Sequence, residues 1–293
     1  MAGSDGPATG RLRPGVRFML ASALAFSVMT AFVKLAGERL PSQEIVFARA
    51  LISVVLSVSL LARARVALWG TRARRPLLLL RGIFGFAGLS CVFYAVTHMP
   101  LAEAVVIQYL HPLFTAVLAA FFLGERVDRG VATGAALSLL GVLLVAKPAM
   151  LFGAGQSLPT LALLAALGGA FFSGCAYVCV RKLGETEHPL VIVLYFPLVT
   201  VPATLPTLVG SAVLPEGQEW LWLLCVGVFA QLGQVALTRG MQHESAARAT
   251  GLSYMQVVFA ALWGVLLFDE IPDALAVAGA GLILAGSFAT GRR

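Results

Sequence analysis

The sequence predicts an all-α membrane protein with ten transmembrane helices in two inverted five-helix repeats, N-in/C-in. Three observations support this prediction. The composition is 59% hydrophobic and 12% charged, whereas soluble domains carry roughly 25% charged residues. Apolar segments of about 20 residues, the length that spans a bilayer core, recur along the chain. The second half also repeats the first half in a diluted form.

The internal repeat is visible when the sequence is shifted by 145 residues against itself. The stretch 82–142 then meets 227–287 without a gap, and the matched pairs include Tyr109 with Tyr254. Duplicated membrane halves are the usual architecture of secondary transporters. Further matched pairs are Gly82 with Gly227, Gly88 with Gly233, His98 with His243, Glu125 with Glu270, Gly134 with Gly279 and Gly141 with Gly286.

The apolar segments define the elements of each predicted repeat. We expect a cytoplasmic tail over 1–16, a first five-helix repeat over 17–147 and a second, inverted five-helix repeat over 159–290. Strands are excluded because the segments are too long and lack alternation with period two. The expected spans are 17–37, 44–62, 77–97, 101–123 and 130–147, followed by 159–181, 188–209, 218–241, 245–268 and 272–290.

Individual spans of the first repeat have distinguishing features. The first span is too long for a signal peptide and ends in the sequence KLAGE at 34–38, without a clean small-residue cleavage site, so we expect a retained helix. Pro112 should bend the fourth span. Small residues should allow close helix packing in the third, fifth and tenth spans. These are Gly82, Gly85, Gly88, Gly130, Gly134, Gly279 and Gly281.

Orientation follows from Lys and Arg, which accumulate in short cytoplasmic loops. With the N-terminus inside, the opposite side keeps only Lys34, Arg39, Arg49 and Lys147 of the 21 basic residues. The net charge of +7 then comes from basic residues in cytoplasmic loops, which set the topology and interact with anionic lipid. Nucleic-acid binding is therefore not expected. The expected cytoplasmic set is Arg11, Arg13, Arg17, Arg63, Arg65, Arg72, Arg74, Arg75, Arg81, Arg126, Arg129, Arg181, Lys182, Arg239, Arg248, Arg292 and Arg293.

Three motifs resemble the signature of EamA-type members of the drug/metabolite transporter (DMT) superfamily. They are PLAEA at 100–104, QYLHP at 108–112 and FLGE at 122–125, with weaker echoes at 245–249, 252–254 and 268–270. His111 stands where the family often has a carboxylate or a small polar residue, and Val257 replaces the second-repeat proline. The resemblance implies a central cavity lined by spans one, three, four, six, eight and nine. Bacterial chains of this length resemble exporters of amino acids and related metabolites.

Polar residues at mid-bilayer usually face a cavity or a partner, and they predict the same centre. Gln108, His111 and Thr115 share one helical stripe, and Ser253 and Gln256 occupy the repeat-equivalent positions of the first two. Hydrogen bonding between helices is the alternative role for these side chains. The predicted substrate-binding residues are Phe26, Thr30, Tyr94, Gln108, His111, Tyr177, Gln231, Gln234, Ser253, Tyr254 and Gln256.

The residue types at this centre favour a small amphipathic substrate. Gln can hydrogen-bond both a carboxylate and an ammonium group. A phosphate site would require Arg or Lys deep in the membrane, and none is expected there, because Lys34 and Arg49 are placed near helix ends. Together with the resemblance, which implies export of amino acids, this predicts an inner-membrane transporter that exports small amphipathic metabolites, mainly neutral or aromatic amino acids, by alternating access. Proton coupling through His111 and uncoupled transport both remain open.

Other functions are alternatives. Drugs, nucleotide sugars and phosphorylated metabolites are alternative cargoes. A membrane-embedded enzyme is the next alternative, but such an enzyme needs a nucleophile–base pair or clustered acids. A channel would show rings of repeated polar groups. No cofactor, metal or disulfide is expected, since Cys91, Cys175, Cys179 and Cys225 lie in apolar spans without ligands nearby. The expected partners are a small-molecule substrate and the lipid bilayer, and the chain acts as a monomer or homodimer.

Overall fold

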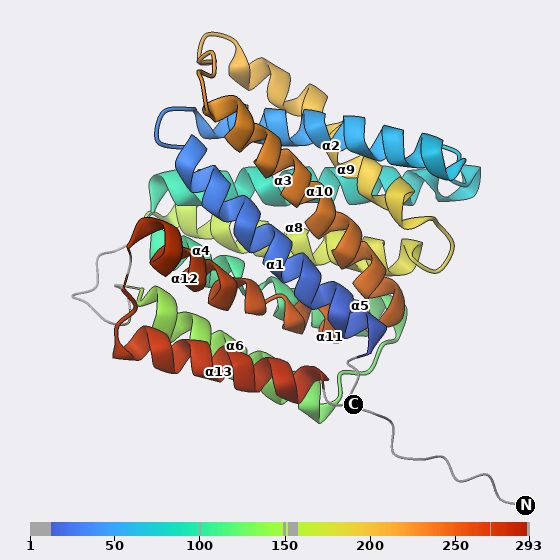
Figure 1. Cartoon of the computed structure of the whole chain (residues 1–293). Coiled ribbons are helices and arrows are strands. Elements are labelled where there is room, and N and C mark those ends of the chain that lie inside the picture. The colour runs from blue at the N-terminus through green and yellow to red at the C-terminus, as the bar shows by residue number, and fades with distance from the viewer. Residues whose placement is uncertain (1–12, 100, 149–150, 152–157, 270, 292–293) are drawn as a thin grey trace, which may run out of the picture.

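A computed structural model of the chain describes residues 13–99, 101–148, 151, 158–269 and 271–291. Within this described part the regular structure is helical, and ten helical segments are long and apolar enough to cross a membrane. This confirms the predicted fold class. Figure 1 shows the helices running between two ends of the molecule. They are α1 (Pro14–Ala36), α2 (Ser42–Ala64), α3 (Arg75–His98), α4 (Leu101–Gln108), α5 (His111–Leu123), α6 (Arg129–Ala146), α8 (Thr160–Leu183), α9 (Pro189–Leu208), α10 (Glu219–His243), α11 (Ala246–Leu252), α12 (Met255–Phe268) and α13 (Ala274–Gly291), with a short 3₁₀ turn, η1 (Arg72–Arg74).

The observed boundaries lie within three residues of the expected spans. α1 begins at Pro14, whose missing N–H and fixed φ suit the first helical turn. The helix therefore includes the last residues of the predicted tail. Arg11, Pro100, Glu270, Arg292 and Arg293 lie outside the described residues.

Large apolar side chains cover the outside of the bundle. Phe121 is 82% exposed, Val209 85% and Ile271 89%. Exposed apolar surface on this scale indicates contact with another apolar phase, and helices that satisfy their own backbone hydrogen bonds suit a bilayer. The chain is a multi-pass integral membrane protein.

The longest helix–helix contacts join one half of the chain to the other. α1 packs against α10 and α3 packs against α8. Since α1 and α8 open the two halves and α3 and α10 are the third spans, these are equivalent contacts made twice. α2 likewise packs against α9, and α6 lies beside α13 along one edge of the molecule (Figure 1).

The fourth span is broken near its middle. α4 ends at Gln108 and α5 begins at His111. Pro112 lacks the N–H that would bond the Gln108 carbonyl in a continuous helix. The predicted bend at Pro112 is therefore an interruption of the helix.

The ninth span is broken at the equivalent place without a proline. α11 ends at Leu252 and α12 begins at Met255. Here the Ser253 hydroxyl donates to the Thr250 carbonyl at 2.6 Å, and hydroxyl groups that bond to the preceding turn bend helices. Because Tyr109 and Tyr254 are repeat equivalents and both lie in the breaks, the interruption is itself repeated.

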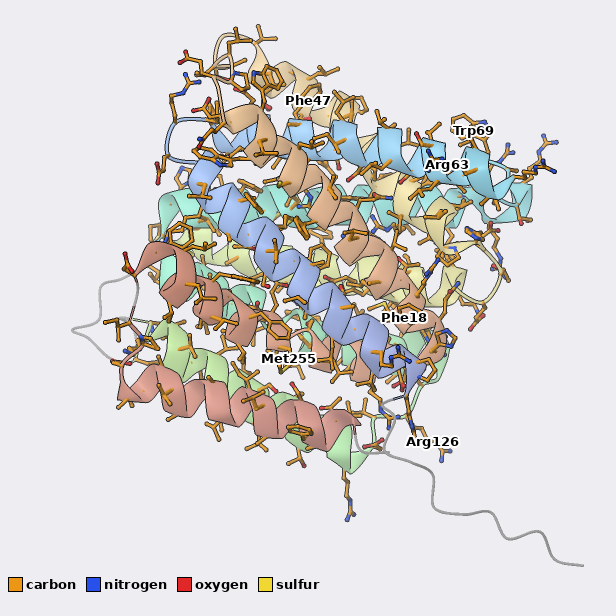
Figure 2. All side chains as sticks on the ribbon, viewed as in Figure 1. Phe18, Phe47, Arg63, Trp69, Arg126 and Met255 are labelled. Atoms are coloured by element: carbon orange, nitrogen blue, oxygen red, sulfur yellow. The ribbon has the colours of Figure 1, made fainter. Side chains whose placement is uncertain are left out.

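Basic side chains project from one end of the bundle. Figure 2 shows Arg63, in the last turn of α2, and Arg126, after α5, at the same end of the molecule. Both were expected on the cytoplasmic side. The N-in/C-in orientation stays a prediction, and the terms cytoplasmic and outer below follow it.

Candidate functional site

A cavity of about 160 Å³ lies between the two halves of the chain. α2, α3 and α4 line it from the first half, and α8, α9 and α10 line it from the second. Its polar lining consists of Arg49, Arg81, Gln108, Ser173, Tyr177 and Gln234. Of the predicted substrate-binding residues, the structure brings three to this cavity, namely Gln108, Tyr177 and Gln234.

Arg81 is the most enclosed charged group in this cavity. It is only 3% exposed and lies in the second turn of α3. One terminal nitrogen of its guanidinium donates to Gln234 Oε1 at 3.0 Å, while Nε has no hydrogen-bond partner within the described residues. The guanidinium carbon lies 5.1 Å from the centre of the Phe196 ring.

Arg49 approaches the same ring from α2. Its guanidinium carbon lies 5.7 Å from the Phe196 ring centre. Both guanidinium carbons therefore lie within about 6 Å of the same ring centre, which brings the two positive charges close to each other. Both interactions are cation–π contacts with a neutral ring, so Phe196 positions the two charges without neutralising them.

The two arginines correct the sequence-based placement of charge. Arg81 was assigned to a cytoplasmic loop and Arg49 to a helix end. In the structure both line the cavity. A charged side chain within a membrane span is stabilised when it faces the interior of the helix bundle or a polar cavity instead of lipid. The expectation of a centre with few fixed charges was therefore wrong.

Gln108 adds a neutral polar group to the cavity wall. Its amide nitrogen donates to Ser173 Oγ at 3.3 Å across the boundary between the halves. Its amide oxygen is buried and has no partner among the described residues. This oxygen can accept a hydrogen bond from a ligand.

His111 lies beside the cavity, and Tyr254 packs where the two helix breaks meet. His111 is buried, and its ring centre lies 5.2 Å from that of Tyr177, which lines the cavity. The Tyr254 hydroxyl donates to the Tyr109 carbonyl at 2.9 Å, and the two rings stack at 5.6 Å. The two helix breaks thus contact each other through repeat-equivalent residues.

The other predicted residues occupy different positions. Phe26 packs where α1 crosses Gly233 of α10, and the Thr30 hydroxyl donates to the Phe26 carbonyl at 2.8 Å. Gln231 donates to Ser57 Oγ at 2.8 Å and joins α10 to α2. Phe26 and Gln231 therefore make contacts between helices, which was the alternative role considered for polar residues in the spans, whereas Thr30 is exposed and bonds within α1. Of the remaining three, Tyr94 stacks on His98, the Ser253 hydroxyl bonds within the break, and Gln256 is half-buried on α12.

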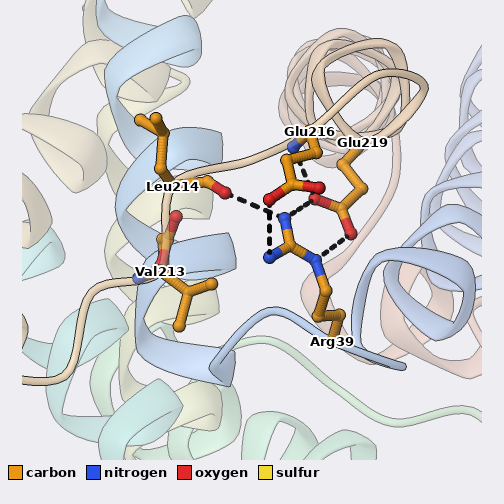
Figure 3. A network of polar contacts seen from close by, with 6 residues as sticks. Arg39, Val213, Leu214, Glu216 and Glu219 are labelled. Atoms are coloured by element: carbon orange, nitrogen blue, oxygen red, sulfur yellow. Dashed lines mark hydrogen bonds and ion pairs between the residues drawn. The ribbon is translucent and has the colours of Figure 1, made fainter.

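Ion pairs join the two halves at the outer end. Arg39, between α1 and α2, donates from Nε to Glu219 Oε1 at 2.7 Å, and one terminal nitrogen donates to the Leu214 carbonyl at 2.8 Å (Figure 3). Glu216 Oε1 lies 3.6 Å from the other terminal nitrogen. This network connects the loop after α1 with the loop before α10.

A second network joins the halves at the cytoplasmic end. Arg181 of α8 donates from Nε to Glu125 Oε1 at 2.7 Å, and the other oxygen of Glu125 accepts from the Ala246 backbone N–H at 2.7 Å. The Glu125 carboxylate, just after α5, therefore connects this loop with α8 and α11. Nearby, Arg248 donates to Asp128 Oδ2 at 2.9 Å.

Other features of the described residues do not form a polar site. Larger hollows of about 450 and 800 Å³ are lined almost entirely by apolar side chains such as Phe122 and Phe121, and they suit lipid chains. No group of three His, Cys, Asp or Glu side chains in the described part of the chain could hold a metal ion. The cavity between the halves is therefore the candidate site.

Comparison with known proteins supports a transport function. Residues 13–147 and 160–292 both match the EamA-like transporter family. The chain is 39% identical over 282 residues to the pseudopaline exporter CntI of Pseudomonas aeruginosa, covering 96% of this chain and 97% of that protein. It is 28% identical to human solute carrier family 35 member G1, over 93% of this chain and 77% of the relative. A crystal structure with 21% identity superposes with a TM-score of 0.81 over 96% of this chain and 99% of the other, which supports the fold alone.

Proposed function

Because the chain belongs to the EamA-like transporter family, we propose that it exports a small amphipathic metabolite by alternating access to the cavity between its halves. The single observation that carries this proposal is the position of the cavity. Helices of both halves line it, and its polar groups converge from both sides. A site at the boundary between two repeats can face each side of the membrane in turn when the repeats rock against each other.

The paired helix breaks support this mechanism. An interrupted helix can bend at the gap while its two segments stay rigid. The break at Tyr109 follows Gln108 on the cavity wall, and it contacts the break at Tyr254. A change of angle at one break therefore reaches the other directly.

The ion pairs at the two ends would act as alternate gates. Arg39 with Glu219 holds the outer end, and Arg181 with Glu125 holds the cytoplasmic end. Transport by this mechanism requires one network to separate while the other remains formed. Partly exposed ion pairs suit this role, because each contributes only a small stabilisation.

The direction and the cargo are proposed from the relatives and from the cavity. Similarity to an exporter supports outward transport, and the family and its named relatives are transporters, which favours transport over enzymatic activity. An amino acid or a related metabolite carries a carboxylate that Arg49 or Arg81 can bind. Proton coupling through His111 stays a hypothesis.

Alternating access can be tested without knowledge of the substrate. Ser173, on the cavity wall, is changed to cysteine in a chain whose four native cysteines are replaced by serine. A membrane-impermeant thiol reagent is then added to right-side-out or inside-out vesicles. We expect Ser173→Cys to react in both kinds of vesicle, because the cavity opens to each side of the membrane in turn.

A lipid-facing position provides the control. A side chain at Gly281 would meet nothing within 4 Å, so Gly281→Cys should resist the impermeant reagent from both sides. Reaction of Ser173→Cys from one side only, or from neither, contradicts alternating access.

A further inference from the structure

We infer that the transported substrate is a small organic anion with two acidic groups, which Arg49 and Arg81 bind together, and with a hydroxyl or amine that donates to Gln108. This inference rests on the proposed transport function and specifies the substrate class of the same cavity. It follows from charges that the protein leaves uncompensated.

The positive charge of the cavity is fixed. Arginine does not lose its proton in proteins, so Arg49 and Arg81 each carry a full charge. Within the described part of the chain, the ion pairs that form involve other basic residues and neither of these two. Burial of an unpaired charge is strongly unfavourable.

The neutral contacts of the two arginines do not remove this charge. Phe196 offers a ring face to both, and Gln234 accepts one hydrogen bond from Arg81. Two like charges on one ring also repel each other. A ligand with two negative groups would neutralise both charges, and a carboxylate or phosphate matches the planar guanidinium with paired hydrogen bonds.

Simple membrane anchoring does not explain these side chains. An arginine near a helix end normally extends its head group to the interface. Arg81 is only 3% exposed, and both guanidinium groups line the cavity. Their position at the boundary of the two halves is where a transported group would bind.

A neutral zwitterion fits the cavity less well than a diacid. Its one carboxylate would satisfy one arginine, and its ammonium group would add another positive charge. The polar lining of the cavity contains no carboxylate among the described residues. The available acceptor for a donor group is the buried amide oxygen of Gln108, which has no partner in the described part of the chain.

The cavity volume limits the size of the bound group. At about 160 Å³ it is smaller than the ~300 Å³ of the smallest typical drug-sized pockets. A four-carbon hydroxy diacid such as malate is an appropriate probe. Succinate lacks the hydroxyl, succinamide lacks both charges, phenylalanine is a neutral zwitterion, and glycerol 3-phosphate replaces the carboxylates with a phosphate.

Ligand-dependent stabilisation of the purified full-length protein in detergent tests the inference. We expect malate to raise the thermal unfolding temperature more than succinate does, while succinamide and phenylalanine leave it unchanged. A response to glycerol 3-phosphate without one to malate or succinate would show that a single phosphate, and not two acidic groups, binds the arginines, and it would contradict the inference. Absence of a response to all three anions would overturn it.

Variants separate binding from a structural role. Arg81→Gln and Arg49→Gln should each weaken malate binding at least about tenfold, the loss that corresponds to one charged hydrogen bond. Without ligand, both variants should be as stable as the parent or more stable, because an unpaired buried charge is removed. Arg63→Gln removes an exposed charge from α2 and should leave binding unchanged.

The Gln108→Leu variant tests the donor contact. It should bind malate and succinate equally, because only malate has a hydroxyl that could donate to the lost amide. Unchanged malate affinity in Arg81→Gln, or lower unliganded stability of that variant, would contradict the inference. If Ser173→Cys reacts from both sides while no anion binds, only the substrate class fails and alternating access stands.

Discussion

Replacement of Gly141 by alanine should force α6 and α13 apart. A Cβ atom at Gly141 would lie 2.5 Å from the Gly279 carbonyl oxygen, and one at Gly279 would lie 2.6 Å from the Gly141 carbonyl. Gly134 and Gly286 face each other in the same way, at 2.5 Å in both directions. These four glycines form a symmetric seam in which each repeat contributes two equivalent positions.

The cost follows from the contact distance. Ordinary contact begins at 3.4 Å, so the Gly141→Ala helices must separate locally by roughly 1 Å, which forfeits a quarter to a half of the dispersion energy of each affected contact. Overpacking of this kind costs about 1–3 kcal/mol. The obstacle is backbone, which cannot rotate away as a flexible side chain could.

Gly281→Ala is the matched control. It lies on the same helix pair, and its Cβ would meet nothing within 4 Å. From the sequence we predicted that Gly281, like Gly279, allows close helix packing. In the structure only Gly279 of these two lies against the neighbouring helix. Because both variants gain the same helix propensity of about 1 kcal/mol, their difference isolates the packing cost.

The measurement is the free energy of unfolding of each purified variant in mixed micelles as the fraction of denaturing detergent increases. We expect Gly141→Ala to be less stable than Gly281→Ala by about 1–3 kcal/mol. Equal stability of the two variants would refute the packing argument.

Two further predictions concern single hydrogen bonds. Asp128 caps α6 by accepting from the Val131 N–H at 2.9 Å, and this bond, together with Arg248, holds the pKa of the Asp128 carboxyl below its usual range. Asp128→Ala should cost about 1 kcal/mol, and Asp128→Asn less, because asparagine also caps helices. The stability that this carboxylate contributes is fully present above the unfolded pKa of about 3.9 and is lost as the pH falls through the lower folded pKa. The free-energy cost of Asp128→Ala should therefore become smaller in that acidic range. A cost that stays constant with pH would contradict this. Tyr254→Phe keeps the ring and removes the hydrogen bond to Tyr109, which should cost about 0.5–1.5 kcal/mol, and an unchanged unfolding free energy would show that the contact between the breaks is not stabilising.

The helices were predictable because membrane spans are determined by local composition. Each expected span required only a run of about 20 apolar residues, and such a run crosses the membrane however the helices pack against one another. The break at Pro112 was also foreseeable, since proline removes a specific hydrogen bond. The equivalent break before Met255 was not foreseen, because serine and threonine bend a helix only when their hydroxyl groups bond to the preceding turn.

The candidate site was only partly predictable. Gln108, Tyr177 and Gln234 were chosen because polar groups inside spans need partners, and they do line the cavity. Arg49 and Arg81 were missed as site residues. Arg49 lies near a helix end and Arg81 follows a basic segment, so both were attributed to membrane orientation. Neither has a basic equivalent in the other half: shifts of 148 and 145 residues pair them with Pro197 and Val226. The repeat therefore gave no signal, and only their position on the cavity wall identifies them.

The central claim is that the arginine-lined cavity between the halves is the transport site. The most direct measurement is counterflow of labelled malate into liposomes that contain the purified protein and are preloaded with unlabelled malate. The account predicts saturable uptake that the preload accelerates, retained in Arg63→Gln and lost in Arg81→Gln. Equal counterflow in Arg81→Gln and the parent protein would contradict it.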